Sequence, residues 1–210
     1  MPEESVTMAV PVRTSLRSIQ RADTRRRLLI AARTLFRTNG VESVSMEDIA
    51  RGAAVGRATI YLHFPGKSVL LTALLEEDWA GQLILFERLG DVDADDRDAL
   101  GAWLMRVVEG MRKAQDSFAI HRAAMGQNAE LVAAHHDHRR KLAVLLQKAL
   151  HAGSSRPRST LEGEIEAAMI VAEIEYFATA AVMMWTQEEV AVGLSLMSQR
   201  LLRFVRQTGD

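Results

Sequence analysis

The sequence predicts an all-α protein of about nine helices, in which a three-helix N-terminal head precedes a longer helical body. Three observations lead to this fold class. Apolar residues recur at helical spacing in long runs, and only 4 prolines interrupt the 210 residues. The composition, 48% hydrophobic and 25% charged, is typical of a globular protein with a core of its own. Breaks that begin with glycine separate the runs, at Gly40, 90–96, 126–128 and 153–160.

The most informative stretch runs from Ser45 to Lys67. Ser45 suits the N-cap of a two-turn helix, and Asp48 stands where the acid of a capping box is found. Residues 54–56 can form a turn, 57–64 a second short helix, and 65–66 its stop. This pattern indicates a helix-turn-helix, although a plain pair of amphipathic helices shows it too.

The second helix of a helix-turn-helix enters the major groove of DNA, so its exposed polar residues are candidates for contact. Arg57 can offer two donors to a guanine edge, and Thr59 can bond a base or a phosphate. Lys67 opens the next helix, where its ammonium group and the free backbone N–H groups can hold one phosphate. The predicted DNA-binding residues are Ser45, Arg57, Ala58, Thr59, Tyr61, His63 and Lys67.

Residues 23–44 add a preceding helix with one apolar face, which Gly40 ends as a C-cap glycine. From residue 23 to about 75 the chain resembles the N-terminal domain of the TetR family of bacterial transcriptional regulators. Ala54 departs from the family, which more often has Gly in this turn. The matching residues are Leu28, Leu29, Ala31, Ala32, Leu35, Phe36, Gly40, Ser45, Ile49, Ala50, Val55, Tyr61, His63, Phe64 and Lys67.

The resemblance implies a DNA-binding head at 23–68 and a ligand-binding and dimerisation body at 69–210, with no cofactor. Residues 1–22 are expected to be a flexible basic extension. In this segment Arg13, Arg17 and Arg21 recur at every fourth position. The spacing fits either an arm that reaches along DNA or a disordered tail with a solvated charge pattern. The net charge is −1, but basic residues predominate in 13–67 and acidic residues elsewhere. This asymmetry is typical of a protein that meets phosphates at one end.

Several classes of function are disfavoured by the sequence. It holds no cysteine, no nucleophile elbow and no phosphate-binding glycine loop after a strand, so we do not expect an enzyme. His135, His136 and His138 make a weak metal site next to basic residues, and a solvated helix face explains them better. Neither a signal-peptide core nor an apolar run of membrane-spanning length is found, which predicts a cytoplasmic protein with no membrane partner.

The body is expected to contain helices at about 66–89, 96–114, 116–125 and 129–152, followed by two long helices at 160–185 and 188–207. The last helix has a narrow apolar seam, and the resemblance implies that the last two helices pair with those of a second copy. An ordinary core within one chain is the alternative. The predicted homodimer interface consists of Val190, Leu194, Met197, Leu201 and Phe204.

The resemblance also implies a small-molecule pocket among the middle helices. Aromatic and Met side chains could line it and a few polar groups could orient a ligand, although each is also compatible with plain core. Glu175 has nearly all apolar helical neighbours and needs a partner, either a cationic ligand or an internal group such as His121 or Arg122. The predicted ligand-binding residues are Trp103, Phe118, His121, Arg122, Met125, Glu175, Tyr176 and Trp185.

Taken with the resemblance, the sequence predicts a homodimeric regulator whose two heads bind a palindromic operator in double-stranded DNA. An unidentified small-molecule effector is expected to release a repressor of this kind, and activation instead of repression stays open. The alternative is a helical protein-interaction module that has lost operator binding.

Overall fold

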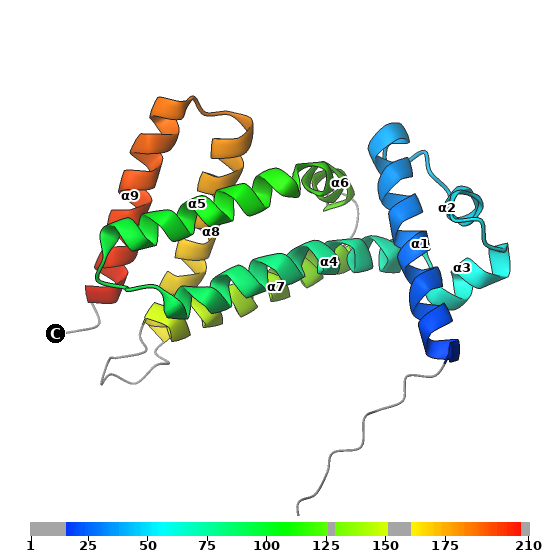
Figure 1. Ribbon diagram of the computed structural model, residues 1–210, viewed down its shortest axis with the longest axis horizontal. Coiled ribbons are helices and arrows are strands. Elements are labelled where there is room, and N and C mark those ends of the chain that lie inside the picture. The colour runs from blue at the N-terminus through cyan, green and yellow to red at the C-terminus, as the bar shows by residue number, and fades with distance from the viewer. Residues whose placement is uncertain (1–15, 126–128, 151–160, 207–210) are drawn as a thin grey trace, which may run out of the picture.

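The computed structural model describes residues 16–125, 129–150 and 161–206, and within these ranges every regular element is helical (Figure 1). The predicted all-α class is therefore confirmed for the described residues. Arg13 and the predicted breaks at 126–128 and 153–160 lie outside them. The elements are α1 (Leu16–Asn39), α2 (Met46–Gly52), α3 (Arg57–His63), α4 (Lys67–Glu87), the 3₁₀ turn η1 (Arg88–Asp91), α5 (Arg97–Lys113), α6 (Gln115–Met125), α7 (Ala129–Leu150), α8 (Leu161–Met183) and α9 (Gln187–Arg206).

The helices form a head and a body (Figure 1). α1, α2 and α3 make the head at one end, and α4 leaves it to run along the body beside α7. On the other side of the body α5 packs against α8 and α9. None of the helices in the described part of the chain is long and apolar enough to cross a lipid bilayer.

The first helix begins earlier than the sequence analysis predicts. Residues 16–22, assigned there to a flexible extension, form the first turns of α1, with Leu16 and Ile19 exposed. All residues from 16 to 22 are exposed, so this part of the helix lacks the buried apolar face on which a prediction from hydrophobic periodicity depends. Straight-chain residues such as Arg17, Gln20 and Arg21 have high helix propensity and lengthen a helix that is already anchored at Leu28.

The head confirms the predicted capping. The Ser45 hydroxyl accepts from Asp48 N–H at 3.1 Å, and the Asp48 carboxylate accepts in return from Ser45 N–H at 3.1 Å. Gly40 ends α1 with φ +81°, a left-handed conformation that favours glycine. Ala54, where the resembling family more often has Gly, also adopts a left-handed conformation with φ +53°. The turn geometry is thus retained at the cost of some strain in an alanine.

The buried apolar residues form two clusters. One fills the head and continues along α4 to Trp79, where Ile120 of α6 and Leu131 of α7 join it. The other fills the body around Trp103, Ile174 and Phe204. The head therefore shares its core with α4, α6 and α7, and apolar packing does not stop at the predicted boundary at residue 68.

The predicted dimer seam on α9 lies largely inside one chain. Leu201 and Phe204 are buried in the body core, and Val190, Leu194 and Met197 are half-buried. The physical reason is that α5 and α8 cover this face of α9. For Leu201 and Phe204 the prediction of an interface between copies is wrong, and the alternative of an internal core holds.

The close approach of α9 to α8 depends on Gly193. A Cβ atom at this position would lie 2.6 Å from the ring of Trp185 and 3.0 Å from that of Phe177. We predict that Gly193→Ala lowers the free energy of unfolding by about 1–3 kcal/mol, because two packed rings would have to move. Urea denaturation measures this change. Gly81→Ala is the control, since a Cβ there meets nothing within 4 Å; an equal loss in both variants would contradict the packing argument.

Candidate DNA-binding surface and body cavity

α3, the predicted recognition helix, presents polar groups outward from the head. Arg57, Ala58 and Tyr61 are exposed, whereas Thr59 and His63 are partly covered. Ile60 and Phe64 point into the head core and fix the orientation of the helix. All five predicted residues of α3 are thus at least partly accessible to a partner.

Glu47 of α2 organises this surface. Its Oε1 lies 3.0 Å from Arg57 Nε and accepts a hydrogen bond from the Tyr61 hydroxyl at 3.2 Å. Because the ion pair uses Nε of Arg57, the two Nη groups stay available for a base edge. Glu47 is not among the residues predicted from the sequence, because its contact with Arg57 depends on how α2 crosses α3 and leaves no signal in the spacing.

Ser45 and Lys67 flank the recognition helix in different ways. The Ser45 hydroxyl donates to Asp48 Oδ2 at 2.6 Å, so its hydrogen already serves the cap of α2. Lys67 lies at the first position of α4, 3.4 Å from the Glu42 carbonyl oxygen and 5.9 Å from the Phe36 ring centroid. The first turn of α4 contains no acidic residue, so its free N–H groups and the ammonium group favour an anion at this point.

Two arginines of α1 extend the basic surface to the end of α3. The Arg25 guanidinium lies 4.9 Å from the Phe64 ring centroid, next to His63. Burial lowers the pKa of His63, and the charges of Arg21 and Arg25 lower it further. His63 is therefore neutral at pH 7 in the free protein and can still donate one N–H to a phosphate oxygen.

The body contains a cavity of about 410 Å³ between α4, α5, α6, α7 and α8. Six of the eight predicted ligand-binding residues line it: Phe118, His121, Arg122, Met125, Glu175 and Tyr176. The other two do not. Trp103 is fully buried, with its indole N–H donating to the Leu85 carbonyl at 2.8 Å. Trp185 packs against Phe177 and Tyr176, where it supports the contact between α8 and α9.

Four important lining residues were not predicted as ligand-binding: Trp79, Gln82, His135 and Arg139. The interpretation of the histidine cluster as a solvated helix face is wrong for His135 and His138. His138 is 3% exposed, stacks on Trp79 with ring centroids 4.7 Å apart, and its Nε2 donates to Gln82 Oε1 at 2.7 Å. Only His136 of the three is exposed. Within the described residues no group of three or more His, Asp or Glu is arranged to hold a metal ion.

Glu175 has the internal partner that its apolar neighbours required, but the partner comes from α7. Its Oε2 lies 2.8 Å from Arg139 Nε. Burial raises the pKa of Glu175, while the charge of Arg139 and the hydrogen bond to it lower the pKa. The two groups therefore form a partly buried ion pair in the wall of the cavity, rather than a lone carboxylate.

The buried histidines predict a decrease in stability at acid pH. Burial lowers the pKa of His138 from 6.5 to about 4, and the pKa of His121 is lowered to about 4 in the same way. Between pH 6.5 and about pH 4 the unfolded chain binds protons at these histidines that the folded chain does not. The free energy of unfolding therefore decreases as the pH falls through this range. For His138 the loss is about 3 kcal/mol. His138→Phe should remove that part of the pH dependence in urea denaturation, whereas His136→Phe should leave it unchanged. A parallel pH profile for all three proteins would contradict this account.

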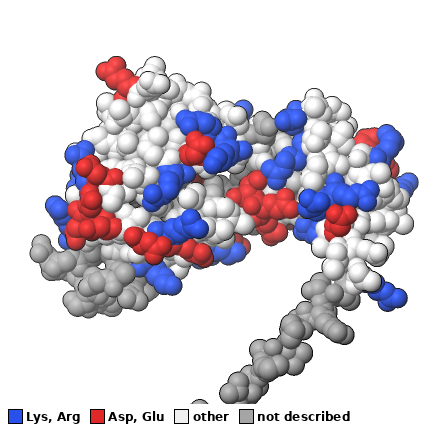
Figure 2. Space-filling view, in the orientation of Figure 1, with Lys and Arg blue, Asp and Glu red and all other residues white. Residues whose placement is uncertain are grey.

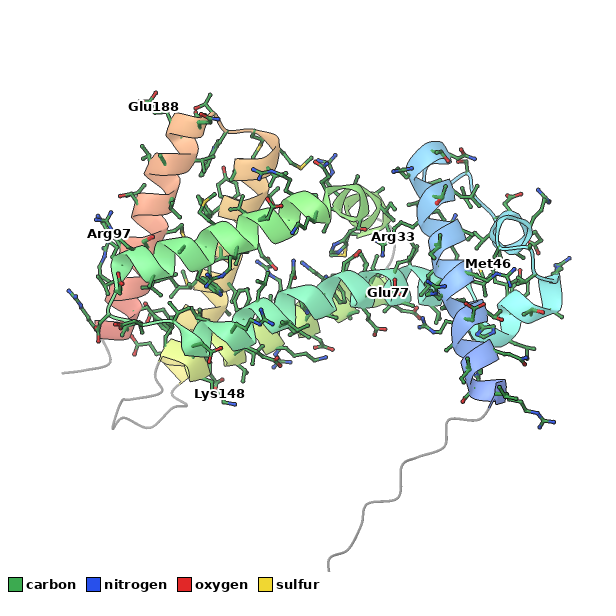
Figure 3. All side chains as sticks on the ribbon, in the orientation of Figure 1. Arg33, Met46, Glu77, Arg97, Lys148 and Glu188 are labelled. Carbon is green, nitrogen blue, oxygen red and sulfur yellow. The ribbon has the colours of Figure 1, made fainter. Side chains whose placement is uncertain are left out.

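A polar cluster, here called the head–body clasp, joins three helices beside the cavity. Arg33 of α1 lies 2.9 Å from Asp78 Oδ1 of α4 and donates to the Ser117 hydroxyl of α6. A second carboxylate of α4, Glu77 Oε2, lies 3.5 Å from the same guanidinium. Figure 3 shows Arg33 and Glu77 facing each other where the head meets the body, and Figure 2 shows acidic side chains gathered at that junction. Since Phe118 and His121 on α6 line the cavity, the clasp connects the cavity wall to the head.

These features define a class of protein: a helix-turn-helix head on a helical body that contains a ligand-sized cavity. Residues 28–74 match the family model described as bacterial regulatory proteins, tetR family. Over 95 residues the chain is 35% identical to an uncharacterized HTH-type transcriptional regulator of Mycobacterium bovis, a match that covers 45% of this chain and 48% of that protein. The chain thus spans about half the length of the curated relatives it matches.

Solved structures agree with the fold over nearly the whole chain. GusR of Salmonella enterica superposes with a TM-score of 0.66 at 18% identity, covering 88% of this chain and 96% of that one. SmeT in complex with triclosan superposes with a TM-score of 0.61 at 21% identity, covering 88% and 90%. The family match over residues 28–74 confirms the resemblance of the head to the TetR family of bacterial regulatory proteins that the sequence predicts. The matched family and the Mycobacterium bovis relative are described as regulators rather than enzymes.

Proposed function

We propose that this protein is a homodimeric repressor in the cytoplasm that binds a palindromic operator through α3 and is released when a small molecule enters the body cavity. The observation that carries the proposal is the pairing of an exposed recognition helix, organised by Glu47, with a cavity whose wall is tied to the head. Each half of this proposal rests on separate contacts.

DNA binding is supported by the chemistry of the head. Arg57 can read a guanine with its Nη groups while Glu47 fixes the side chain, and Thr59 and Tyr61 lie on the same helix. Lys67 at the start of α4 and the arginines of α1 are suited to phosphates on either side of the groove. These residues are all present, which argues against a module that has lost operator binding.

Dimerisation is supported by an apolar surface that one chain leaves uncovered, here called the outer face. α8 buries Ile170 and Ile174 in the body core, yet Ile165 and Met169 are 53% and 56% exposed. On α9 Val192 and Leu196 are exposed in the same way. Two helices with apolar side chains on both sides fit a four-helix interface with a second copy, and a patch of this kind is costly to leave in water.

Release is supported by the head–body clasp. A ligand that contacts Phe118 and His121 presses on α6, whose Ser117 bonds Arg33 of α1. A shift of α6 relative to α4 then changes the tilt of the head and the separation of the two recognition helices. The ligand must prefer this shifted state over the operator-binding one, since equal affinity for both would release nothing.

Selection of bound duplexes from a random DNA pool, at two salt concentrations, tests the proposal. A palindrome with half-sites about 34–36 Å apart and steep salt dependence is expected, because each head occupies one major groove and neutralises phosphates. A folded protein that enriches no sequence, or enriches an asymmetric one, would contradict it.

A further inference from the structure

The cavity in the body is larger than its main chamber. A second cavity of about 220 Å³ shares Gln82, Met111 and Glu175 with the first and is walled mainly by apolar side chains. Asp78 of the head–body clasp also lines it. The two chambers together can accept a molecule of drug-like size, and one end of that molecule would lie against the clasp.

The two carboxylates in the cavity walls already have partners. Glu175 pairs with Arg139 at 2.8 Å, and Asp78 pairs with Arg33 at 2.9 Å. Arg122 also lines the main chamber and Lys113 lines the second one, where its Nζ lies 3.7 Å from Glu109 Oε1. Both side chains are exposed to solvent, where pairing with an anion contributes little. A charged ligand would therefore lose its hydration without gaining a buried partner, unless it first broke one of these pairs.

In contrast, two buried side-chain atoms in the described part of the chain have no hydrogen-bond partner: His121 Nε2 and Asp78 Oδ2. Asp78 Oδ2 belongs to a carboxylate that pairs with Arg33, so it accepts hydrogen bonds. His121 is neutral at pH 7 because burial and His135 lower its pKa to about 4, so one of its ring nitrogens accepts. Both atoms are shielded from water, and a turn of either side chain into its chamber breaks no existing hydrogen bond at that atom.

The remaining lining is aromatic and thioether surface, with Trp79, Phe118 and Tyr176 around the main chamber and Met111 between the two. Such surfaces favour flat rings and polarizable groups. We infer that the effector is an uncharged aromatic compound that carries a hydroxyl group, with its ring between these side chains and its O–H donated to His121 or Asp78. This inference rests on the proposed function, because it assigns the ligand class of the same cavity.

Four probes with the same ring system test the ligand class by calorimetry on the full chain without DNA, at pH 7. They are 2-naphthol, naphthalene, 2-naphthoate and 2-naphthylmethylammonium. We expect 2-naphthol to bind about two- to tenfold more tightly than naphthalene, the gain typical of one hydrogen bond, and both charged probes to bind more weakly. Tightest binding of the naphthoate or the ammonium probe, or no binding of any probe, would overturn the inference.

Variants identify the acceptor. His121→Phe keeps the aromatic volume and should abolish the advantage of 2-naphthol over naphthalene while naphthalene still binds. His136→Phe, the same change at an exposed position, should keep that advantage. If His121→Phe retains the full advantage, the same comparison with Asp78→Ala must remove it; retention in both variants would overturn the assignment of the acceptors.

A separate titration of the protein bound to its selected duplex distinguishes this inference from the proposed function. Binding of 2-naphthol without release of DNA would contradict the proposed release and leave the ligand class standing. Release by the naphthoate or the ammonium probe alone would support the proposed function and overturn the ligand class.

Discussion

Met169→Asp should convert the protein from a dimer to a monomer and weaken its binding to the palindrome by about 10²–10⁴-fold. Met169 is 56% exposed on the outer face, where a second copy would bury it. A carboxylate at that position cannot be desolvated without a partner, so the interface would not close. The second head then loses the high effective concentration that dimerisation provides, which accounts for the size of the effect. Sedimentation equilibrium and fluorescence anisotropy measure the two changes.

Ile84→Asp provides the matched control. Ile84 is 50% exposed on α4, away from the outer face of α8 and α9, so the same substitution should leave both the mass and the affinity unchanged. A dimeric Met169→Asp protein with wild-type affinity would show that the copies meet elsewhere.

Arg57→Ala should weaken binding to the palindrome by about 2–6 kcal/mol, since each of two half-sites loses a base contact of about 1–3 kcal/mol. The loss should be confined to one base position, where the selected sequences become degenerate. Glu47 holds the side chain by its Nε before DNA arrives, so little side-chain freedom is lost when the contact forms. Competition between the selected duplex and single-base variants measures the specificity at each position.

Lys67→Ala is the comparison for Arg57→Ala. Lys67 meets a phosphate in this account, so its loss should weaken all duplexes alike and reduce the slope of affinity against salt by about one per head. If both variants lost affinity uniformly across sequences, the assignment of Arg57 to a base would be wrong.

The head was predictable because its determinants are local. A capping box at Ser45, a C-cap at Gly40 and helical spacing from Leu28 to Phe36 each act within a few residues, and the structure reproduces them. The start of α1 was not predictable, because residues 16–22 lengthen the helix but none of their side chains is buried.

The cavity was only partly predictable. Phe118, Met125 and Tyr176, which were predicted because aromatic and Met side chains suit a pocket, do line it. Trp103 was predicted on the same ground but is buried in the core. What separates these cases is the packing of α5 and α7 on their neighbours, which sequence spacing does not contain. The suggested internal partners of Glu175 are on α6, whereas its partner Arg139 is on α7, and helix packing is again the reason. Sequence spacing likewise does not indicate that His135 and His138 pack against Trp79.

The same limit applies to α9. An apolar seam indicates that a helix packs against another helix, and it does not indicate whether that helix belongs to the same chain. Leu201 and Phe204 pack on their own α5 and α8, whereas Met169 and Leu196 remain exposed.

The most direct test of the central claim is a titration of the wild-type protein against the selected palindrome and against a duplex that carries one half-site. The mass of each complex should be measured in the same samples. Two copies on the palindrome, with affinity at least 10²-fold above that for the half-site, are expected of a dimer whose heads bind together. One copy on the palindrome, or equal affinity for both duplexes, would contradict the account.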